Sequence, residues 1–464
     1  MKRLFGTDGM RGEAGTFPLD AETVRTAGRA CALQLAEKQG RAPRIVLGRD
    51  TRESGEWLET AFMAGAREAG AVCESAGIIT TPGVAFLARA LPADAGVVIS
   101  ASHNPYHDNG IKIFAPTGHK IADAMERRIE ADIYAERDGR GPVDSPVASA
   151  AGGRFEVPET DAGSGSKSLR DRYLNYLAGE VAGRLELNDL HMIVDCANGA
   201  AFELAPELFT RLGAHVTAIN NTPNGRNINL NCGALHIESL SQKVVAERAD
   251  LGVAFDGDAD RALFINGRGD LVDGDATLWI MARRLAARGE LTGNRVVATV
   301  MSNLGLELAL RSCGIELRRT DVGDKYVLEE LLRTGAALGG EQSGHIIFPH
   351  ESLAGDGMIT TLHILRAMRE TGRALHDLTA GFIRYPQVLV NVRVREKRPF
   401  DEVAEIAKRV RETEMELGDG GRLLLRYSGT EPLARVMIEG QNQGRIERLA
   451  ISLATVIKET LGDS

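Results

Sequence analysis

Four short stretches of the 464-residue chain combine residue types suited to phosphate or metal chemistry. The first, SASHNPYHDNGIK at Ser100–Lys112, lies between apolar runs, which predicts a strand, a loop and a strand. At its centre stands Ser102, whose hydroxyl is a weak nucleophile until a base, a metal or a strained exposed position activates it. Pro105 biases Asn104 away from helical conformation and holds the loop open. The same residue types also favour ordinary turns, so this stretch alone leaves both interpretations equal.

The second stretch, DGDADR at Asp256–Arg261, follows the apolar run Leu251–Phe255, which predicts a strand. Carboxylates at alternate positions can converge on one hard divalent cation, and oxygen ligands suit Mg²⁺. An EF-hand loop needs glycine where Arg261 stands and glutamate where Gly267 stands, so that alternative fails. A solvated acidic turn is disfavoured, because three close aspartates repel one another unless a cation neutralises them. We therefore predict a metal site here.

The third stretch, GEQSGH at Gly340–His345, offers groups that bind sugar hydroxyls. Glu341 and Ser343 can form hydrogen bonds with vicinal hydroxyls, while His345 can titrate near neutral pH. A lone histidine beside a strand is more often structural. Taken without the other motifs, this stretch therefore favours a structural role.

The fourth stretch, RYSGTEP at Arg426–Pro432, is followed by Arg435. Its small residues expose backbone N–H groups, and hydroxyl and guanidinium donors stand beside them, a combination that suits a phosphate dianion. A plain hairpin turn is the alternative. Because arginines flank the loop on both sides, we prefer phosphate binding.

Composition narrows the class of protein. The net charge is −9, with 26% charged and 43% hydrophobic residues, which is ordinary for a soluble globular enzyme. The negative charge argues against nonspecific nucleic-acid binding, although an acidic protein can hold a local cationic pocket. No run is long and apolar enough for a membrane span, and the first residues, MKRLFGTDGMRG, lack the apolar stretch of a signal peptide. We expect a cytoplasmic protein with no nucleic-acid or membrane partner.

The five cysteines form an odd, scattered set without a C-x-x-C pair. Neither a disulfide framework nor a zinc site is indicated. We expect all five to be small buried hydrophobic residues. They are Cys31, Cys73, Cys196, Cys232 and Cys313.

Helices and strands alternate through most of the chain, which predicts mostly parallel sheets covered on both faces. At about 150 residues per domain, the length suggests three domains, or four if one is small. A repeat of strand, polar loop, helix, glycine and strand begins at Ile45, Met192 and Val296. Its glycines suit the left-handed position that ends a helix. They are Gly70, Gly213 and Gly314.

Two other regions differ from this repeat. Gly139–Lys167 is rich in glycine, serine and proline, which marks a linker or an exposed loop. After Arg384 a β-α-β-β-α order predicts a small separate α+β domain. Its expected elements are strands at Val388–Val394, Arg422–Tyr427 and Arg435–Glu439, a helix over about Phe400–Glu416, and a final helix from about Arg445.

The four motifs, taken in order, resemble those of the α-D-phosphohexomutases, and the resemblance runs from Phe5 to Glu439. It implies an α/β protein with three similar mixed or parallel α/β domains and a smaller C-terminal α+β domain around a central cleft. The domains implied are residues 1–150 with the phosphoserine loop, 151–254 with the metal loop at its end, 255–372 with the sugar-binding loop, and 373–464 with the phosphate-binding loop.

Within the family, the sequence is most like the bacterial phosphoglucosamine mutase branch. Gln342 stands where the phosphomannomutase/phosphoglucomutase branch usually has methionine, and Gly323-Asp324-Lys325 replaces a stretch that tends to carry histidine there. The stretch NGRNINLNCGALH at Asn224–His236 also resembles the phosphoglucosamine mutase branch. Tyr427 is a departure, because lysine is common at that position and its absence trims local positive charge.

The resemblance implies an isomerase in which phosphorylated Ser102 passes its phosphoryl group to glucosamine 6-phosphate. Glucosamine 1,6-bisphosphate is the implied intermediate, and glucosamine 1-phosphate is released for UDP-N-acetylglucosamine and cell-wall synthesis. The implied Mg²⁺ ligands are Asp256, Asp258, Asp260 and the phosphate on Ser102. Arg11 is expected to neutralise the transferring group, and Lys112 and His345 are the candidate bases. The implied substrate-binding residues are His103, Arg261, Glu341, Ser343, Arg426, Ser428, Gly429, Thr430 and Arg435.

Three alternatives stay open from the sequence. A phosphomannomutase or phosphoglucomutase of the same family would differ mainly in the sugar that it recognises. A metal-dependent sugar phosphatase would transfer the phosphoryl group to water instead. A sugar-phosphate binding protein would leave Ser102 and the aspartates unexplained. The oligomeric state is also open, and a homodimer is one of the arrangements that the sequence allows.

Overall fold

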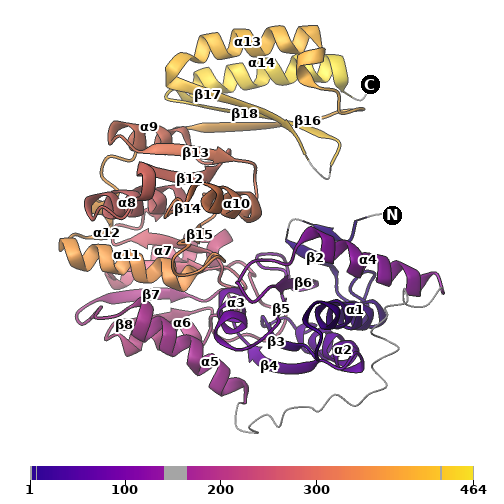
Figure 1. Cartoon of the computed structure of the whole chain (residues 1–464). Coiled ribbons are helices and arrows are strands. Elements are labelled where there is room, and N and C mark those ends of the chain that lie inside the picture. The colour runs from indigo at the N-terminus through magenta and orange to yellow at the C-terminus, as the bar shows by residue number, and fades with distance from the viewer. Residues whose placement is uncertain (1–2, 7, 140–164, 429–430, 463–464) are drawn as a thin grey trace. The chain divides into compact units, whose positions relative to one another are not determined.

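The computed structural model describes residues 3–6, 8–139, 165–428 and 431–462. Contacts divide the chain into two compact units, residues 1–293 with 323–380, and residues 294–322 with 381–464. The four-domain division expected from the sequence stays a prediction. The predicted linker Gly139–Lys167 lies mostly outside the described residues. Within them, the architecture is three mixed α/β regions followed by an antiparallel sheet with two long helices (Figure 1).

The first region is a six-stranded sheet with the order β1-β2-β6-β5-β3-β4. Parallel pairing joins β3 to β4 and β5, whereas β6 is antiparallel to both β5 and β2. The strands are β1 (Phe5–Gly6), β2 (Gly9–Glu13), β3 (Arg44–Arg49), β4 (Val72–Ile78), β5 (Ala95–Ile99) and β6 (Asp108–Phe114). The helices are α1 (Ala21–Gln39), α2 (Gly55–Glu68), α3 (Thr81–Ala90) and α4 (Asp123–Arg137).

Close packing of α1 on α2 depends on small residues at the crossing. A side chain at Gly65 would place its Cβ 1.8 Å from the carbonyl oxygen of Arg25, and one at Gly28 would lie 2.1 Å from that of Phe62. Neither position can accept a larger residue without moving the helices apart. The two helices therefore cover the sheet as one tight layer, and β5 and β6 lead directly into and out of the Ser102 loop.

The second region is a five-stranded sheet with the order β11-β10-β9-β7-β8. Its strands are β7 (His191–Asp195), β8 (His215–Ile219), β9 (Leu251–Phe255), β10 (Ala262–Asn266) and β11 (Leu271–Val272). Its helices are α5 (Ser166–Asn175), α6 (Leu204–Arg211) and α7 (Glu238–Glu247), and a π-helix at Tyr176–Val181 continues α5. The predicted strand before the aspartates is β9, and the aspartates form the connection between antiparallel β9 and β10.

The third region contributes elements to both compact units. In the first unit, α8 (Gly274–Ala287), α10 (Asp324–Thr334), α11 (Gly357–Thr371) and α12 (Leu375–Leu378) accompany the antiparallel pair of β14 (Gly339–Gly340) and β15 (Ile346–Ile347). In the second unit, α9 (Leu304–Ser312) connects the parallel strands β12 (Arg295–Thr299) and β13 (Glu316–Thr320). The three repeat glycines have the predicted left-handed backbone, with φ of 84° at Gly70, 94° at Gly213 and 70° at Gly314.

The C-terminal sheet is antiparallel with the order β16-β18-β17, drawn in yellow in Figure 1. Its strands are β16 (Gln387–Arg393), β17 (Gly421–Tyr427) and β18 (Leu433–Gly440). The helices of the same domain are α13 (Ala404–Leu417) and α14 (Gln443–Leu461). The predicted helix from Phe400 is divided, because a 3₁₀ turn at Phe400–Glu402 precedes α13. The other predicted elements of this domain are confirmed within one or two residues at each end.

Four cysteines are buried as expected, but Cys313 is exposed and corrects that prediction. It stands just after α9 at the C-cap, where the chain turns at the surface, so its thiol faces outward. Among the described helices, none combines the length and the apolar character that a membrane-spanning segment requires.

Candidate active site

Ser102 lies at the end of β5 in a strained backbone conformation, with a φ of 53°. A positive φ is uncommon for residues other than glycine and persists only where the surroundings hold it. The backbone N–H of Ser102 donates to Ser100 Oγ at 2.9 Å, and its own hydroxyl donates to Asp256 Oδ2 at 2.5 Å. The residue is 1% exposed. The loop therefore aims the hydroxyl at the aspartates rather than at water.

Arg52, which the sequence analysis did not identify, holds this loop in place. Its guanidinium donates to the carbonyl oxygens of Ser102 at 3.0 Å and Asn104 at 2.8 Å, and also to those of Pro105 and Asp108. Its Nε donates to a carboxylate oxygen of Asp50 at 2.9 Å, and the side chain is fully buried. A single cation thus organises four carbonyl groups of the loop. The polar run GRDTR, which begins in the last two residues of β3, was the available signal, but spacing did not reveal the partners.

The three aspartates lie together between β9 and β10, as predicted, and all are buried. One ligand oxygen from each lies within 4.8 Å of the others. Asp258 Oδ1 and Asp260 Oδ1 are buried without a hydrogen-bond partner among the described residues. Buried carboxylate oxygens are costly to leave unpaired, and oxygen ligands suit a hard divalent cation. The donor set therefore fits Mg²⁺.

The electrostatics of the three aspartates also favour a bound cation. Burial raises the pKa of Asp256 well above its usual range, and the neighbouring charges of Asp260 and Asp258 raise it further. Carboxylates that repel each other in a buried site hold a proton until a cation takes its place. Binding of a divalent ion here would release that proton.

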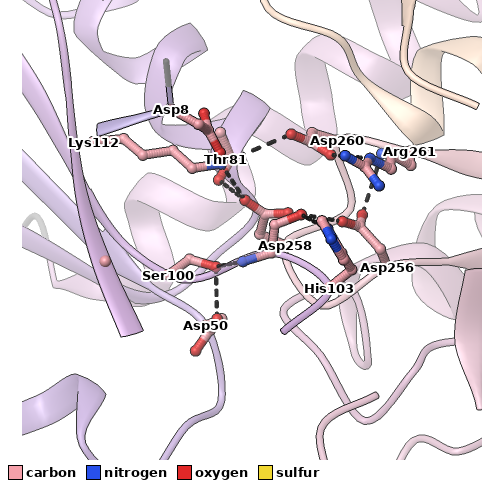
Figure 2. A network of polar contacts seen from close by, with 12 residues as sticks. Asp8, Asp50, Thr81, Ser100, His103, Lys112, Asp256, Asp258, Asp260 and Arg261 are labelled. Atoms are coloured by element: carbon pink, nitrogen blue, oxygen red, sulfur yellow. Dashed lines mark hydrogen bonds and ion pairs between the residues drawn. The ribbon is translucent and has the colours of Figure 1, made fainter. Parts of the chain in front are cut away.

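Lys112 enters the cluster from β6, and Figure 2 shows its side chain reaching the aspartates beside Asp8. Its Nζ lies 3.0 Å from Asp258 Oδ2, 3.1 Å from Asp8 Oδ2 and 3.8 Å from Asp260 Oδ2. Burial alone would lower the pKa of Lys112, but these carboxylates raise it. Lys112 therefore carries a positive charge in this arrangement. Arg11, on β2, forms an ion pair with the same Asp8.

The two histidines near the site have opposite electrostatic surroundings. Burial would lower the pKa of His345, but Asp260, 3.5 Å from its Nδ1, raises it to about 9. Burial, Arg261 and Arg11 lower the pKa of His103 to about 4, and its Nδ1 lies 3.3 Å from Ser102 Oγ. At neutral pH the ring of His345 is charged and that of His103 is neutral.

The sugar-binding motif forms the loop between β14 and β15 and lies in the same compact unit as Ser102. Glu341 and Ser343 face each other, with Ser343 Oγ donating to Glu341 Oε2 at 3.4 Å. Gln342 turns to the buried Asp275, to which its amide donates at 3.1 Å. Gln342 thus binds a carboxylate on α8. Asp275 was not identified from the sequence.

Arg261 follows the aspartates directly and remains close to them. Its backbone N–H donates to Asp256 Oδ1 at 3.2 Å, and its Nε lies 3.8 Å from Asp260 Oδ1. A cavity of about 340 Å³ opens beside Asp260, Lys112 and His345. Asp260, Lys112 and His345 therefore border a space that can hold a small molecule.

The phosphate-binding motif lies in the second compact unit, between β17 and β18. Arg426 and Arg435 are opposite each other in the antiparallel register, so both guanidinium groups start from one face of the sheet. Arg435 donates to Ser428 Oγ at 3.4 Å. Burial and the charge of Arg435 lower the pKa of Arg426, which is the effect of two crowded cations. Gly429 and Thr430 lie outside the described residues.

Tyr427 has a structural explanation. Its ring stacks on Phe400 with centroids 4.2 Å apart, and its hydroxyl donates to the carbonyl of Arg398 at 2.5 Å. Because alternate residues of a strand face opposite sides, Tyr427 points away from the face that carries Arg426. Its side chain is part of the packing of this unit.

Four domain models of one family match the chain. They are phosphoglucomutase/phosphomannomutase alpha/beta/alpha domain I at residues 2–140, domain II at 171–269, domain III at 273–385, and the C-terminal domain at 389–456. A phosphoglucosamine mutase of Solibacter usitatus is 51% identical over 462 residues, covering 100% of both chains. One of Mycobacterium bovis is 46% identical over 458 residues, covering 98% of this chain and 99% of the relative.

Solved structures share the fold. A phosphoglucomutase/phosphomannomutase family protein of Burkholderia thailandensis superposes with a TM-score of 0.79 at 25% identity, covering 98% of this chain and 97% of the other. An N-acetylphosphoglucosamine mutase of Aspergillus fumigatus, solved with GlcNAc-6P and magnesium, gives a TM-score of 0.63 at 18% identity, covering 98% and 95%.

Proposed function

Because the chain belongs to the phosphoglucomutase/phosphomannomutase family, we propose that it is a phosphoglucosamine mutase. The observation that carries this proposal is the 51% identity, over the full length of both chains, to the Solibacter usitatus phosphoglucosamine mutase. The proposed reaction interconverts glucosamine 6-phosphate and glucosamine 1-phosphate. Its product would serve the synthesis of UDP-N-acetylglucosamine for the cell wall.

In this proposal, Ser102 carries the phosphoryl group. The bond from phosphorus to Ser102 Oγ breaks, a bond from phosphorus to the free sugar hydroxyl forms, and glucosamine 1,6-bisphosphate results. The intermediate then turns over, its other phosphoryl group returns to Ser102 Oγ, and the isomeric monophosphate leaves. Supporting this role, the strained loop places the serine oxygen against Asp256.

Asp256, Asp258 and Asp260 would hold Mg²⁺ together with the phosphate on Ser102. When bound there, Mg²⁺ withdraws negative charge from the transferring group and from the serine oxygen. Lys112 and Arg11 add positive charge beside the same position. Because phosphoryl transfer passes through a loose transition state, such fixed charges and in-line positioning supply most of the rate enhancement.

The attacking sugar hydroxyl must lose a proton, and the serine oxygen must gain one when its phosphoryl group leaves. Lys112 and His345 are the proposed groups for these transfers. Their raised pKa values mean that both hold a proton near neutral pH, so each starts as a proton donor and positive charge. Acceptance of the hydroxyl proton then requires prior loss of a proton, which makes the rate rise with pH in the range where His345 titrates.

Glu341 and Ser343 would bind sugar hydroxyls, with His103 and Arg261 beside the reacting phosphate. Arg426, Ser428, Gly429, Thr430 and Arg435 would bind the phosphate that does not react. Two guanidinium groups from one face of the sheet, with the Ser428 hydroxyl beside Arg435, supply charged donors for a dianion.

The test compares initial mutase rates on glucosamine 6-phosphate, glucose 6-phosphate and mannose 6-phosphate with Mg²⁺ and phosphorylated enzyme. We expect the largest kcat/KM for the amino sugar, by about tenfold or more. Ser102→Ala should abolish turnover, and wild-type activity in that variant would contradict the assigned nucleophile. Equal or higher rates on glucose or mannose phosphate would keep the mechanism and overturn the substrate.

Inorganic phosphate is measured in the same reactions, because it separates a mutase from a phosphatase. A mutase should release far less phosphate than it forms isomer. Phosphate release without isomerisation would show transfer to water and overturn the mutase assignment. Binding of sugar phosphates without metal-dependent turnover would identify a binding protein instead.

A further inference from the structure

We propose that Thr81 is a positioning residue that selects which oxygen of Asp258 faces the metal. Thr81 is the first residue of α3, far from the aspartates in sequence, and the four motifs do not include it. Its role rests on the metal site of the proposed function. It concerns the orientation of one ligand rather than the reaction itself.

Two contacts join Thr81 to Asp258. The hydroxyl of Thr81 donates to Asp258 Oδ2 at 2.6 Å, and its backbone N–H donates to the Asp258 carbonyl oxygen at 3.0 Å. The residue is 3% exposed, so water does not compete for either contact. Figure 2 shows Thr81 and Lys112 approaching Asp258 together. One residue thereby fixes both the backbone and the side chain of a proposed ligand.

The two oxygens of the Asp258 carboxylate have different surroundings. Oδ2 accepts from Thr81 and from Lys112, whose Nζ lies 3.0 Å away. Oδ1 is buried and has no hydrogen-bond partner in the described part of the chain. With Oδ2 occupied by two donors, Oδ1 is the oxygen left for a cation. Outer-sphere contacts of this kind orient metal ligands and tune affinity.

The start of α3 is built to hold the Thr81 hydroxyl still. Thr80 is the N-cap and accepts from the Gly83 N–H, and Pro82 follows in the first turn. The threonine side chain is branched at Cβ, which restricts χ1. Thr81 is therefore presented on a rigid helix end, as a positioning contact requires.

Lys112 cannot replace Thr81 in this role. Its Nζ also pairs with Asp8 and lies near Asp260, so its position is shared among three carboxylates. If the hydroxyl is removed, Oδ2 keeps a charged donor that it shares with Asp8 and Asp260, but it loses its only uncharged donor among the contacts described here. The carboxylate can then rotate, and the site loses its preset ligand geometry.

The test measures Mn²⁺ binding by the unphosphorylated protein, followed by the electron paramagnetic resonance signal of free Mn²⁺. Thr81→Val keeps the shape and the backbone N–H but removes the hydroxyl. We expect its dissociation constant to rise by about tenfold or more, the usual range for loss of an outer-sphere partner. Thr81→Ser restores the hydroxyl and should bind within about twofold of wild type.

A second pair and a control complete the design. Thr81→Ala also removes the hydroxyl and should follow Thr81→Val, which keeps the test valid if the valine variant does not fold. Thr413→Val makes the same change in α13 of the other compact unit, where the buried hydroxyl donates to the Arg409 carbonyl at 2.8 Å. It should bind Mn²⁺ like wild type.

Wild-type affinity in folded Thr81→Val would overturn the proposal, as would equal losses in the serine and valine variants. Absence of Mn²⁺ binding by the wild-type protein would instead overturn the metal site, and the role of Thr81 with it. No sugar is present in these measurements. An error in the proposed substrate would therefore leave their outcome unchanged.

Discussion

The serine and metal loops differ from the phosphate-binding loop in how firmly their side chains are held. Ser102, Asp256 and Asp258 are almost completely buried, and their polar contacts come from several elements. Arg435 keeps 30% of its side chain exposed and has contacts with Ser428 and Glu431 at 3.3 to 3.4 Å. The side chains of the serine and metal loops are therefore held in one position by many contacts, whereas the Arg435 side chain is free to adjust.

This difference matches the tasks proposed for the two regions. Phosphoryl transfer needs charges that are already in place when the bond breaks, because reorganisation would add to the barrier. A phosphate-binding loop that serves both isomers must accept a phosphate attached at either of two sugar positions. Long, half-exposed arginines can adjust to both, at the cost of some precision.

Replacement of Arg52 tests the rigid region most severely. Arg52→Lys keeps the charge but cannot donate to four carbonyl groups at once, so Ser102 should leave its strained conformation. We expect kcat to fall by about 100-fold or more, as expected for a small displacement of a reacting group. Arg25→Lys, at an exposed ion pair with Glu68, is the control. Near-normal kcat in folded Arg52→Lys would contradict the scaffold role.

The buried carboxyl group of Asp356, the N-cap of α11, should make the stability of the protein depend on pH. Burial raises the pKa of Asp356 from 3.8 to about 6, although Tyr173 and the Ile359 and Met358 N–H groups counteract that rise. A raised carboxyl pKa means that the folded state binds the proton more tightly. Its stabilising effect is complete below about pH 4 and is lost as the pH rises through about 6.

Asp356→Asn removes this titration and keeps a residue that can cap α11. Relative to wild type, its stability should rise between pH 4.5 and 7 by about 2 kcal/mol. Urea unfolding of both proteins at the two pH values measures the change. If the two proteins show the same pH dependence, Asp356 is not the titrating group.

A milder change is expected in the adaptable loop. Arg435→Lys retains the charge but loses the paired donors of the guanidinium, so phosphate binding weakens equally in the ground and transition states. KM for the sugar phosphate should rise by about tenfold, with kcat within about threefold of wild type. The control is Arg393→Lys, an exposed position on β16 of the same sheet. A selective loss of kcat would place Arg435 in the transfer step instead.

The smallest effect is expected at Tyr427. Tyr427→Lys introduces a positive charge beside the loop but removes the stacking on Phe400. It should destabilise the protein by about 1 kcal/mol and leave KM within about twofold of wild type. Steady-state kinetics and thermal unfolding measure the two effects. A large fall in KM would show that Tyr427 limits phosphate binding through charge.

Local pattern predicted the elements that carry the site. The apolar run before the aspartates is β9, and the repeat glycines have the left-handed backbone expected of helix ends. Alternating aspartates also sufficed to predict a carboxylate cluster. These features depend on residues that are neighbours in sequence, where periodicity and conformational preference are informative.

Contacts between distant segments were not predictable in the same way. Thr81 and Asp258 are separated by 177 residues, and Asp8 contacts Lys112 from the turn residue just before β2. Nothing in local spacing states that such segments meet, and the pKa of His345 depends on where Asp260 lies. The Ser102 loop shows the limit most clearly. Its composition suited both a turn and a nucleophile, and contacts from distant residues such as Arg52 and Asn229 explain its conformation.

The uneven distribution of the cysteines gives the protein a built-in attachment point for a dye. Burial raises the pKa of Cys31 to about 12 and that of Cys73 to about 11, so these thiols resist alkylation in the folded state. Cys313 is exposed, and it belongs to the second compact unit. A maleimide fluorophore should therefore label each native chain once, without mutagenesis. A dye at this one position would report on the second compact unit by itself.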